Sequence, residues 1–139
     1  MTYSFSGASK NRMTGLLPSL INVNYKALSY GLMDFAVVQG VRTQEEQADI
    51  YAQGRTKPGK IVTWTMDSNH LIQEDGYGHA YDVAPYFKGA IQWNDIEAFN
   101  FLATLHLRAA LELGVSLEWG GHWSEKQRDL PHFQHKKGM

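Results

Sequence analysis

Apolar residues recur at helical spacing early in the chain and then form a short β-branched run. In residues 17–30 they recur every three or four positions, and Gly31 follows. This pattern predicts an amphipathic helix that ends at Gly31, with Pro18 in its first turn. The run at residues 34–41 predicts a strand, because β-branched residues favour extended backbone.

A second helix is predicted directly after this strand. The hydroxyl of Thr43 can cap a helix at residues 44–53, while Glu46 reaches back to complete a capping box. Gly54 would end that helix. The following residues 55–77 are polar and irregular, and a connection of that length in a compact domain is usually functional or mobile.

The second half of the chain combines short strands with one long helix. Strands are expected at residues 79–84, where Pro85 would stop the strand, and at residues 115–119 and 132–135, on either side of a Gly-rich turn. The segment between the first two strands carries an apolar stripe at helical spacing over residues 96–113, which predicts the longest helix of the chain.

This helix also has clear end signals. Asp95 can serve as its N-cap, and Gly114 can end it. Strands and helices are thus mixed along the chain without a regular βαβ alternation. We therefore predict an α+β fold rather than a doubly wound parallel sheet.

The length and charge of the chain limit the classes of function. Its 139 residues, of which 43% are apolar, suffice for one core, so we expect a single domain over residues 1–139. The 13 basic and 14 acidic residues give a net charge of -1, which argues against charge-driven binding to nucleic acid. The chain has no Cys, so a metal would have to be held by His and carboxylate side chains.

The N-terminal segment is polar and rich in Ser, unlike a signal peptide. No stretch approaches the roughly 18 consecutive apolar residues of a membrane-spanning helix. We therefore expect a protein that is made in the cytoplasm without an export signal and does not insert into membranes. We also expect a monomer.

Metal-ligating side chains are concentrated in two segments. SNHLIQEDGYGHAYD at residues 68–82 contains His70 and Asp82, and DLPHFQ at residues 129–134 contains His132. A mononuclear catalytic zinc site needs three nitrogen or oxygen ligands and an open position for water. His70, Asp82 and His132 supply such a set, and we expect them to bind zinc.

The second segment also contains a candidate general base. Asp129 precedes His132 by three residues, and Pro131 fixes the turn between them. A carboxylate beside the metal can take a proton from zinc-bound water, whose pKa is lowered to about 7. Asp129 is therefore expected to act as the base without binding the metal itself.

Four short motifs occur in a fixed order along nearly the whole chain. They are SxH, GxAxD, EWGG and DxPHF, carried by Ser68 and His70, by Gly78, Ala80 and Asp82, by residues 118–121, and by Asp129, Pro131, His132 and Phe133. In this order they resemble the zinc peptidases related to D-alanyl-D-alanine carboxypeptidases, and most of all phage endolysins that are L-alanyl-D-glutamate peptidases. The segment VVQGVRTQEEQ at residues 37–47 supports the resemblance.

The resemblance implies a hedgehog-like α+β fold in which a small antiparallel sheet, flanked by helices, carries zinc on the three expected ligands. It implies Asp129 as general base and Arg42 as a cation near the substrate carbonyl or carboxylate. The implied substrate is the stem peptide of bacterial peptidoglycan, cut between L-alanine and D-glutamate during lysis of the host cell. Such an enzyme would reach the cell wall through a membrane lesion made by a separate protein.

Two features depart from the family pattern. The family has the pattern HxxGxAxD, whereas His70 and Asp82 are separated by additional residues, and strict spacing would place Asp75 at the ligand position, with His79 as a third candidate. We prefer His70, because His79 lies at an odd offset from Asp82 and should point to the opposite face of the strand. The other departure is His122 after EWGG, where relatives often have an acidic residue.

Several residues have a structural interpretation beside the functional one. Arg42 could pair with a glutamate of the following helix instead of contacting substrate. Glu118 could be a structural carboxylate, or it could orient a metal-bound His. Ser68 could bond its hydroxyl to the backbone in a turn or support the site. His106, on the apolar face of the long helix, is expected to be a core histidine.

The predicted function is zinc-dependent hydrolysis of peptidoglycan by a phage lysis enzyme. A D-alanyl-D-alanine carboxypeptidase or dipeptidase would use the same chemistry but would need a fixed positive group for the terminal carboxylate. A non-catalytic zinc or cell-wall binding module would keep the three ligands but would have no use for Asp129. The presence of Asp129 therefore favours an enzyme.

Overall fold

A computed structural model describes residues 2–61 and 68–136 of the chain. Its elements, in chain order, are α1 (Gly7–Arg12), α2 (Pro18–Ser29), β1 (Phe35–Gln39), α3 (Gln44–Ala52), β2 (Ala80–Phe87), β3 (Ala90–Ile91), α4 (Ile96–Leu113), β4 (Leu117–Trp119), the short 3-10 helix η1 (Gly120–His122) and β5 (His132–His135). None of the helices in the described ranges is long and apolar enough to span a membrane.

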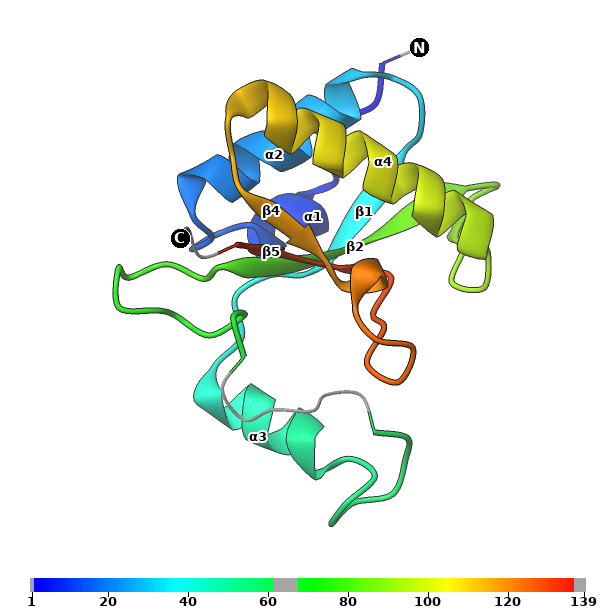
Figure 1. Ribbon diagram of the computed structural model, residues 1–139. Coiled ribbons are helices and arrows are strands. Elements are labelled where there is room, and N and C mark those ends of the chain that lie inside the picture. Colours follow the sequence, from blue (N-terminus) through cyan, green and yellow to red (C-terminus); the bar gives the residue numbers. More distant parts are fainter. Residues whose placement is uncertain (1, 62–67, 137–139) are drawn as a thin grey trace.

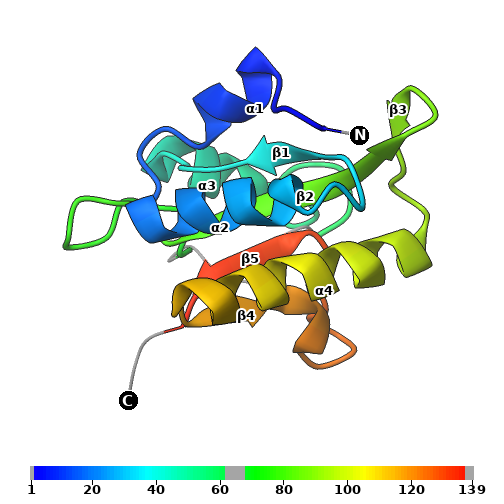
Figure 2. The same cartoon turned by 90° about the horizontal axis from the view of Figure 1, so that it is seen from above.

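The strands form one antiparallel sheet in the order β1-β2-β5-β4, and β3 forms a hairpin with the end of β2. Helices α2 and α4 lie on one side of this sheet and α3 lies on the other (Figure 1). Seen from above, α2 and α4 run side by side across the sheet (Figure 2). This arrangement confirms the predicted α+β fold with a small antiparallel sheet between helices.

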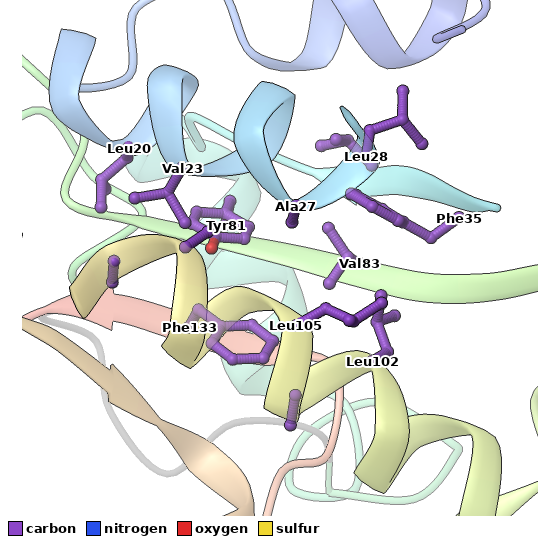
Figure 3. Close-up of a cluster of buried hydrophobic side chains, with 14 of the residues drawn as sticks. Leu20, Val23, Ala27, Leu28, Phe35, Tyr81, Val83, Leu102, Leu105 and Phe133 are labelled. Carbon is purple, nitrogen blue, oxygen red and sulfur yellow. The ribbon is translucent and has the colours of Figure 1, made fainter. Parts of the chain in front are cut away.

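The hydrophobic core lies between the sheet and the helices α2 and α4. Alternate residues of the two central strands, Tyr81 and Val83 on β2 and Phe133 on β5, are buried there. They meet side chains such as Leu20 of α2 and Leu102 of α4 (Figure 3). Because side chains alternate along a strand, the residues between these core positions face the other side of the sheet.

The three longer helices confirm the sequence predictions to within one or two residues. The predicted capping box is present at α3: Thr43 Oγ1 accepts from the Glu46 backbone N–H, and Glu46 Oε1 accepts from the Thr43 N–H, each at 3.0 Å. Asp95 caps α4 by accepting from the Ala98 N–H at 3.0 Å, and Gly114 ends that helix in a left-handed conformation with φ of 70°.

The strand that was predicted to stop at Pro85 continues to Phe87, so this prediction is wrong. The backbone N–H of Val83 points toward β5 and donates to Pro131. Strand alternation turns the nitrogen of Pro85 to the same side, but β5 begins at His132 and does not extend that far. Pro85 therefore removes no hydrogen bond from the sheet and is tolerated in the strand.

Helix α1 and strand β3 were not predicted. Helix α1 covers the free edge of β1, where Ser9 Oγ accepts from the Val37 N–H at 3.0 Å and Arg12 Nη1 donates to the Val37 carbonyl at 3.1 Å. Strand β3 follows a two-residue turn in which Lys88 and Gly89 both have positive φ, the backbone of a tight hairpin.

Candidate metal centre

Three side chains meet on the face of the sheet that α2 and α4 do not cover. Asp82 of β2 and His132 of β5 are directly paired across the sheet, and His70 reaches them from the loop before β2. The distances are 3.1 Å between His132 Nδ1 and Asp82 Oδ1, 3.3 Å between His70 Nε2 and Asp82 Oδ1, and 3.2 Å between the two nitrogens. These atoms form a group that could hold a metal ion.

The size of this triangle fits zinc. Ligand atoms at about 2.0 Å from a tetrahedral zinc ion lie about 3.3 Å from one another. The three measured distances are close to that value, and two imidazole nitrogens with one carboxylate oxygen are a donor set that zinc accepts. The three residues therefore fit a zinc ion, and a fourth tetrahedral position would remain for water or substrate.

The loop that carries His70 is tied to the end of β1. His70 Nδ1 lies 2.8 Å from the Gly40 carbonyl oxygen, and the Arg42 N–H donates to the His70 carbonyl at 2.9 Å. Gly40 is required here, because a Cβ at this position would lie 1.6 Å from the Arg12 carbonyl oxygen. The Ser68 hydroxyl accepts from the His70 N–H at 3.1 Å, so Ser68 supports the turn through the backbone.

The charges of the three side chains are coupled. Burial alone would raise the pKa of Asp82, but the charge of His70 and hydrogen bonds from both imidazoles outweigh it and hold this pKa well below the usual range. Burial alone would lower the pKa of His132, but its hydrogen bond to Asp82 and the charge of that carboxylate raise it. Because metal ligands must be deprotonated, a cation at these atoms would compete with the proton that the raised pKa of His132 favours.

Asp129 lies close enough to these three side chains for their charges to change its pKa. Burial and the Asp82 carboxylate raise the pKa of Asp129 to about 6. The Gly120 carbonyl accepts from the Asp129 N–H at 3.0 Å, and a Cβ on Gly120 would lie 2.4 Å from the Asp129 carbonyl oxygen. The first glycine of the EWGG motif thus lets the loop close with Asp129 near the site.

Arg42 is buried, and its charge acts on both acidic residues of the site. Burial lowers the pKa of Arg42, while Asp82, Glu46 and Asp129 raise it in part. Its Nη1 donates to Gln47 Oε1 at 2.6 Å, and its Nε has no hydrogen-bond partner within the described ranges. Gln47, which the sequence analysis did not single out, lies five residues after Arg42 and is fully buried.

Glu118 does not contact His132 directly. Its carboxylate accepts from the Trp123 indole N–H at 2.6 Å and from the Gln134 side-chain amide at 3.4 Å. Gln134 Oε1 in turn lies 2.8 Å from His132 Nε2. Gln134 was not predicted from the sequence, although its position two residues after His132 places it on the same face of the strand.

The alternative ligands lie outside the group. His79 Nε2 is 2.7 Å from Asp75 Oδ2, and the His79 ring packs edge-on against His135. His122, at the position where the family often has an acidic residue, packs edge-on against Trp119. Within the described ranges, none of these residues belongs to the group that could hold a metal ion.

Residues 1–137 match the family described as phage L-alanyl-D-glutamate peptidase. The chain belongs to this family. Among its relatives, the L-alanyl-D-glutamate peptidase of Escherichia phage T5 is 34% identical over 124 residues, which cover 89% of this chain and 84% of the phage T5 protein.

Cellular relatives of the family are also similar to this chain. The peptidoglycan L-alanyl-D-glutamate endopeptidase CwlK of Bacillus subtilis is 35% identical over 107 residues, which cover 73% of this chain and 60% of CwlK. The crystal structure of the Serratia marcescens L-Ala D-Glu endopeptidase ChiX superposes with a TM-score of 0.78 at 32% identity, covering 95% of this chain and 89% of ChiX.

Proposed function

We propose that this protein is a zinc-dependent peptidoglycan endopeptidase that cuts the bond between L-alanine and D-glutamate in cell-wall stem peptides. The observation that carries the proposal is the triangle of His70, Asp82 and His132 in a chain of this family. Three relatives are named for this same cleavage. The similarity to the phage T5 protein further supports a role as a phage endolysin.

His70 Nε2, Asp82 Oδ1 and His132 Nδ1 would hold the zinc ion. When bound, zinc polarises the carbonyl of the scissile bond and lowers the pKa of water so that it can attack. Asp129, whose pKa of about 6 suits a base at neutral pH, would accept the proton that the attacking water loses. It would then return that proton to the amine of D-glutamate as the carbon–nitrogen bond breaks.

Arg42 would stabilise the negative charge that develops on the substrate. Its guanidinium is buried and remains a cation, and Gln47 fixes one end of it. A positive group in a buried position interacts strongly with developing charge, because water does not screen it. We propose the carbonyl oxygen of the scissile bond, or a neighbouring substrate carboxylate, as its partner.

The proposal extends to how the enzyme acts. We propose that the whole chain is a single peptidase domain that works as a monomer, is made in the host cytoplasm and reaches the wall through a lesion made by another protein. Its partner would be peptidoglycan and not nucleic acid. The nearly balanced charge of the chain supports this view.

Digestion of purified peptidoglycan tests the reaction. Mass spectrometry of the products should show new amino termini at D-glutamate, a chelator should abolish their formation, and added zinc should restore it. Release of terminal D-alanine alone would instead identify a carboxypeptidase. Full activity after complete metal removal would contradict the zinc proposal.

Metal analysis of purified variants tests the ligand set. His70→Ala should lose zinc, whereas His79→Ala and Asp75→Ala should keep it, because the latter two side chains bond to each other away from the triangle. A zinc-loaded His70→Ala protein together with a metal-free Asp75→Ala protein would place the third ligand in the segment between His70 and Asp82.

A further inference from the structure

The two imidazoles of the metal-ligating triangle have their protons fixed in different ways. His70 Nδ1 faces the Gly40 carbonyl oxygen at 2.8 Å. A carbonyl can only accept, so the proton lies on Nδ1 and the lone pair of Nε2 points to the metal position. His132 uses the opposite nitrogen: its Nδ1 faces the metal position, and its Nε2 faces the side-chain amide of Gln134 at 2.8 Å.

An amide does not by itself determine the tautomer of an imidazole. Gln134 could present its oxygen, which requires a proton on His132 Nε2, or its NH₂ group, which would move that proton to Nδ1. A proton on Nδ1 would occupy the lone pair that the metal needs. An amide oxygen turned toward His132 Nε2 therefore favours metal binding, because it draws the proton away from Nδ1, which also faces the Asp82 carboxylate.

Glu118 fixes that orientation. Glu118 and Gln134 are paired across β4 and β5, and Glu118 Oε2 lies 3.4 Å from Gln134 Nε2. A carboxylate can only accept hydrogen bonds, so it attracts the NH₂ end of the amide and leaves the oxygen for His132. The Trp123 indole N–H donates to the same carboxylate oxygen at 2.6 Å and holds it in place.

We propose that Glu118 and Gln134 are positioning residues that set the tautomer of His132 and thereby its ability to bind zinc. The inference rests on the proposed function, because it takes the triangle to be a zinc site. Neither residue needs to contact zinc or substrate. Partners of this kind, which orient a metal-binding His, typically change metal affinity by about 10–100-fold when removed.

An exchange of the two side chains tests the proposal. In E118Q the new amide at position 118 can donate as well as accept, so it no longer forces Gln134 to turn its oxygen toward His132. Zinc affinity should therefore fall by about tenfold or more. In the double variant E118Q/Q134E a carboxylate stands beside His132 and can only accept its proton, so most of the affinity should return. E125Q, which makes the same change at an exposed loop position, should bind zinc like the wild type.

Two measurements are made on each variant. Competition with a chromogenic chelator gives the zinc dissociation constant. Long-range ¹H–¹⁵N NMR of the metal-free protein at alkaline pH reports how the proton of His132 divides between Nε2, which faces Gln134, and Nδ1, which faces Asp82. The share of the Nε2–H form should be smaller in E118Q than in the wild type. The NMR measurement tests the proposal even in a variant that takes up no zinc.

The possible outcomes separate this proposal from the proposed function. A wild-type protein that does not bind zinc would contradict the proposed function, while the NMR spectra would still test the role of Glu118. Unchanged zinc affinity and an unchanged tautomer in E118Q would overturn the positioning role. A double variant that binds zinc no better than E118Q would overturn it as well, because a loss of packing alone is not repaired by the exchange.

Discussion

The two faces of the central strands bury different kinds of side chains. Tyr81 and Phe133 face the helices, where their rings stack 5.5 Å apart in an apolar core. Their neighbours Asp82 and His132 face the other way and place a carboxylate and an imidazole 3.1 Å apart with little exposure to water. The same two strands thus carry the core on one face and the candidate metal centre on the other.

This contrast indicates which face stabilises the fold and which carries the candidate site. Removal of apolar area from water stabilises the helix-covered face directly. The other face brings His70, Asp82 and His132 within hydrogen-bond distance of one another. Ionisable groups with so little exposure cost free energy unless they are paired or bind a metal. We therefore expect variants of neighbouring residues to separate stability from activity.

The largest effect is expected for His132→Ala, on the uncovered face. Loss of one ligand should remove zinc and reduce peptidoglycan hydrolysis by at least about 10⁴-fold, because both carbonyl polarisation and water activation depend on the metal. The core should persist, so the metal-free variant should unfold like the metal-free wild type. Metal analysis, turbidity of cell-wall suspensions and denaturation measure these three quantities.

His135→Ala is the matched control for this variant, because it changes a partly buried His of the same strand outside the triangle. It should keep both zinc and activity. An active, zinc-loaded His132→Ala protein would show that His132 is not a ligand.

The next effect concerns the adjacent residue on the covered face. Phe133 is 1% exposed, and Phe133→Ala should lower the free energy of unfolding by about 3–5 kcal/mol, the usual cost of such a cavity. Urea denaturation measures this change. Phe101→Ala, at an exposed position of α4, should cost less than about 0.5 kcal/mol. A loss below about 1 kcal/mol for Phe133→Ala would mean that the core is loosely packed around this ring.

Asp129→Asn should separate catalysis from metal binding on the uncovered face. Removal of a general base costs about 10²–10⁴-fold in rate, or about 3–5 kcal/mol in the transition state. Zinc content and binding to cell walls should not change. Glu125→Gln, in the same loop, should clear walls at the normal rate. Loss of zinc in Asp129→Asn would show that this residue is a ligand, and normal clearing would remove it from the mechanism.

Local signals predicted the elements that depend on neighbours in sequence. The capping box of α3 and the ends of α4 involve residues within one helical turn, so the sequence contains all the information they need. The continuation of β2 past Pro85 could not be predicted in this way, because it depends on where β5 begins, some fifty positions further on. Helix α1 depends likewise on the edge of β1 that it covers.

The same distinction holds for the candidate site. His70, Asp82 and His132 were found because their side chains are of types that bind metals, even though they come together only through the register of the sheet. Gln134 and Gln47 were missed because an amide is not a typical ligand or base. Only their contacts with His132 and Arg42 indicate a role.

The smallest effect concerns His106, which tests whether water is excluded from the covered face. Its Nδ1 lies 2.7 Å from the Tyr81 hydroxyl oxygen, and burial lowers its pKa to about 3. In the unfolded chain an imidazole has a pKa of about 6.5. Between these values the unfolded state binds a proton that the folded state does not, so stability falls as the pH drops, by about 2 kcal/mol at pH 5.

Denaturation of metal-free protein at pH 5 and at neutral pH measures this loss. His106→Gln removes the titration while leaving an amide oxygen that can accept from Tyr81, so the loss should be smaller in this variant by about 2 kcal/mol. Asp82 and His132 titrate in both proteins, so their contributions cancel in the comparison. Equal losses would mean that His106 takes up its proton without unfolding, and that water reaches the covered face.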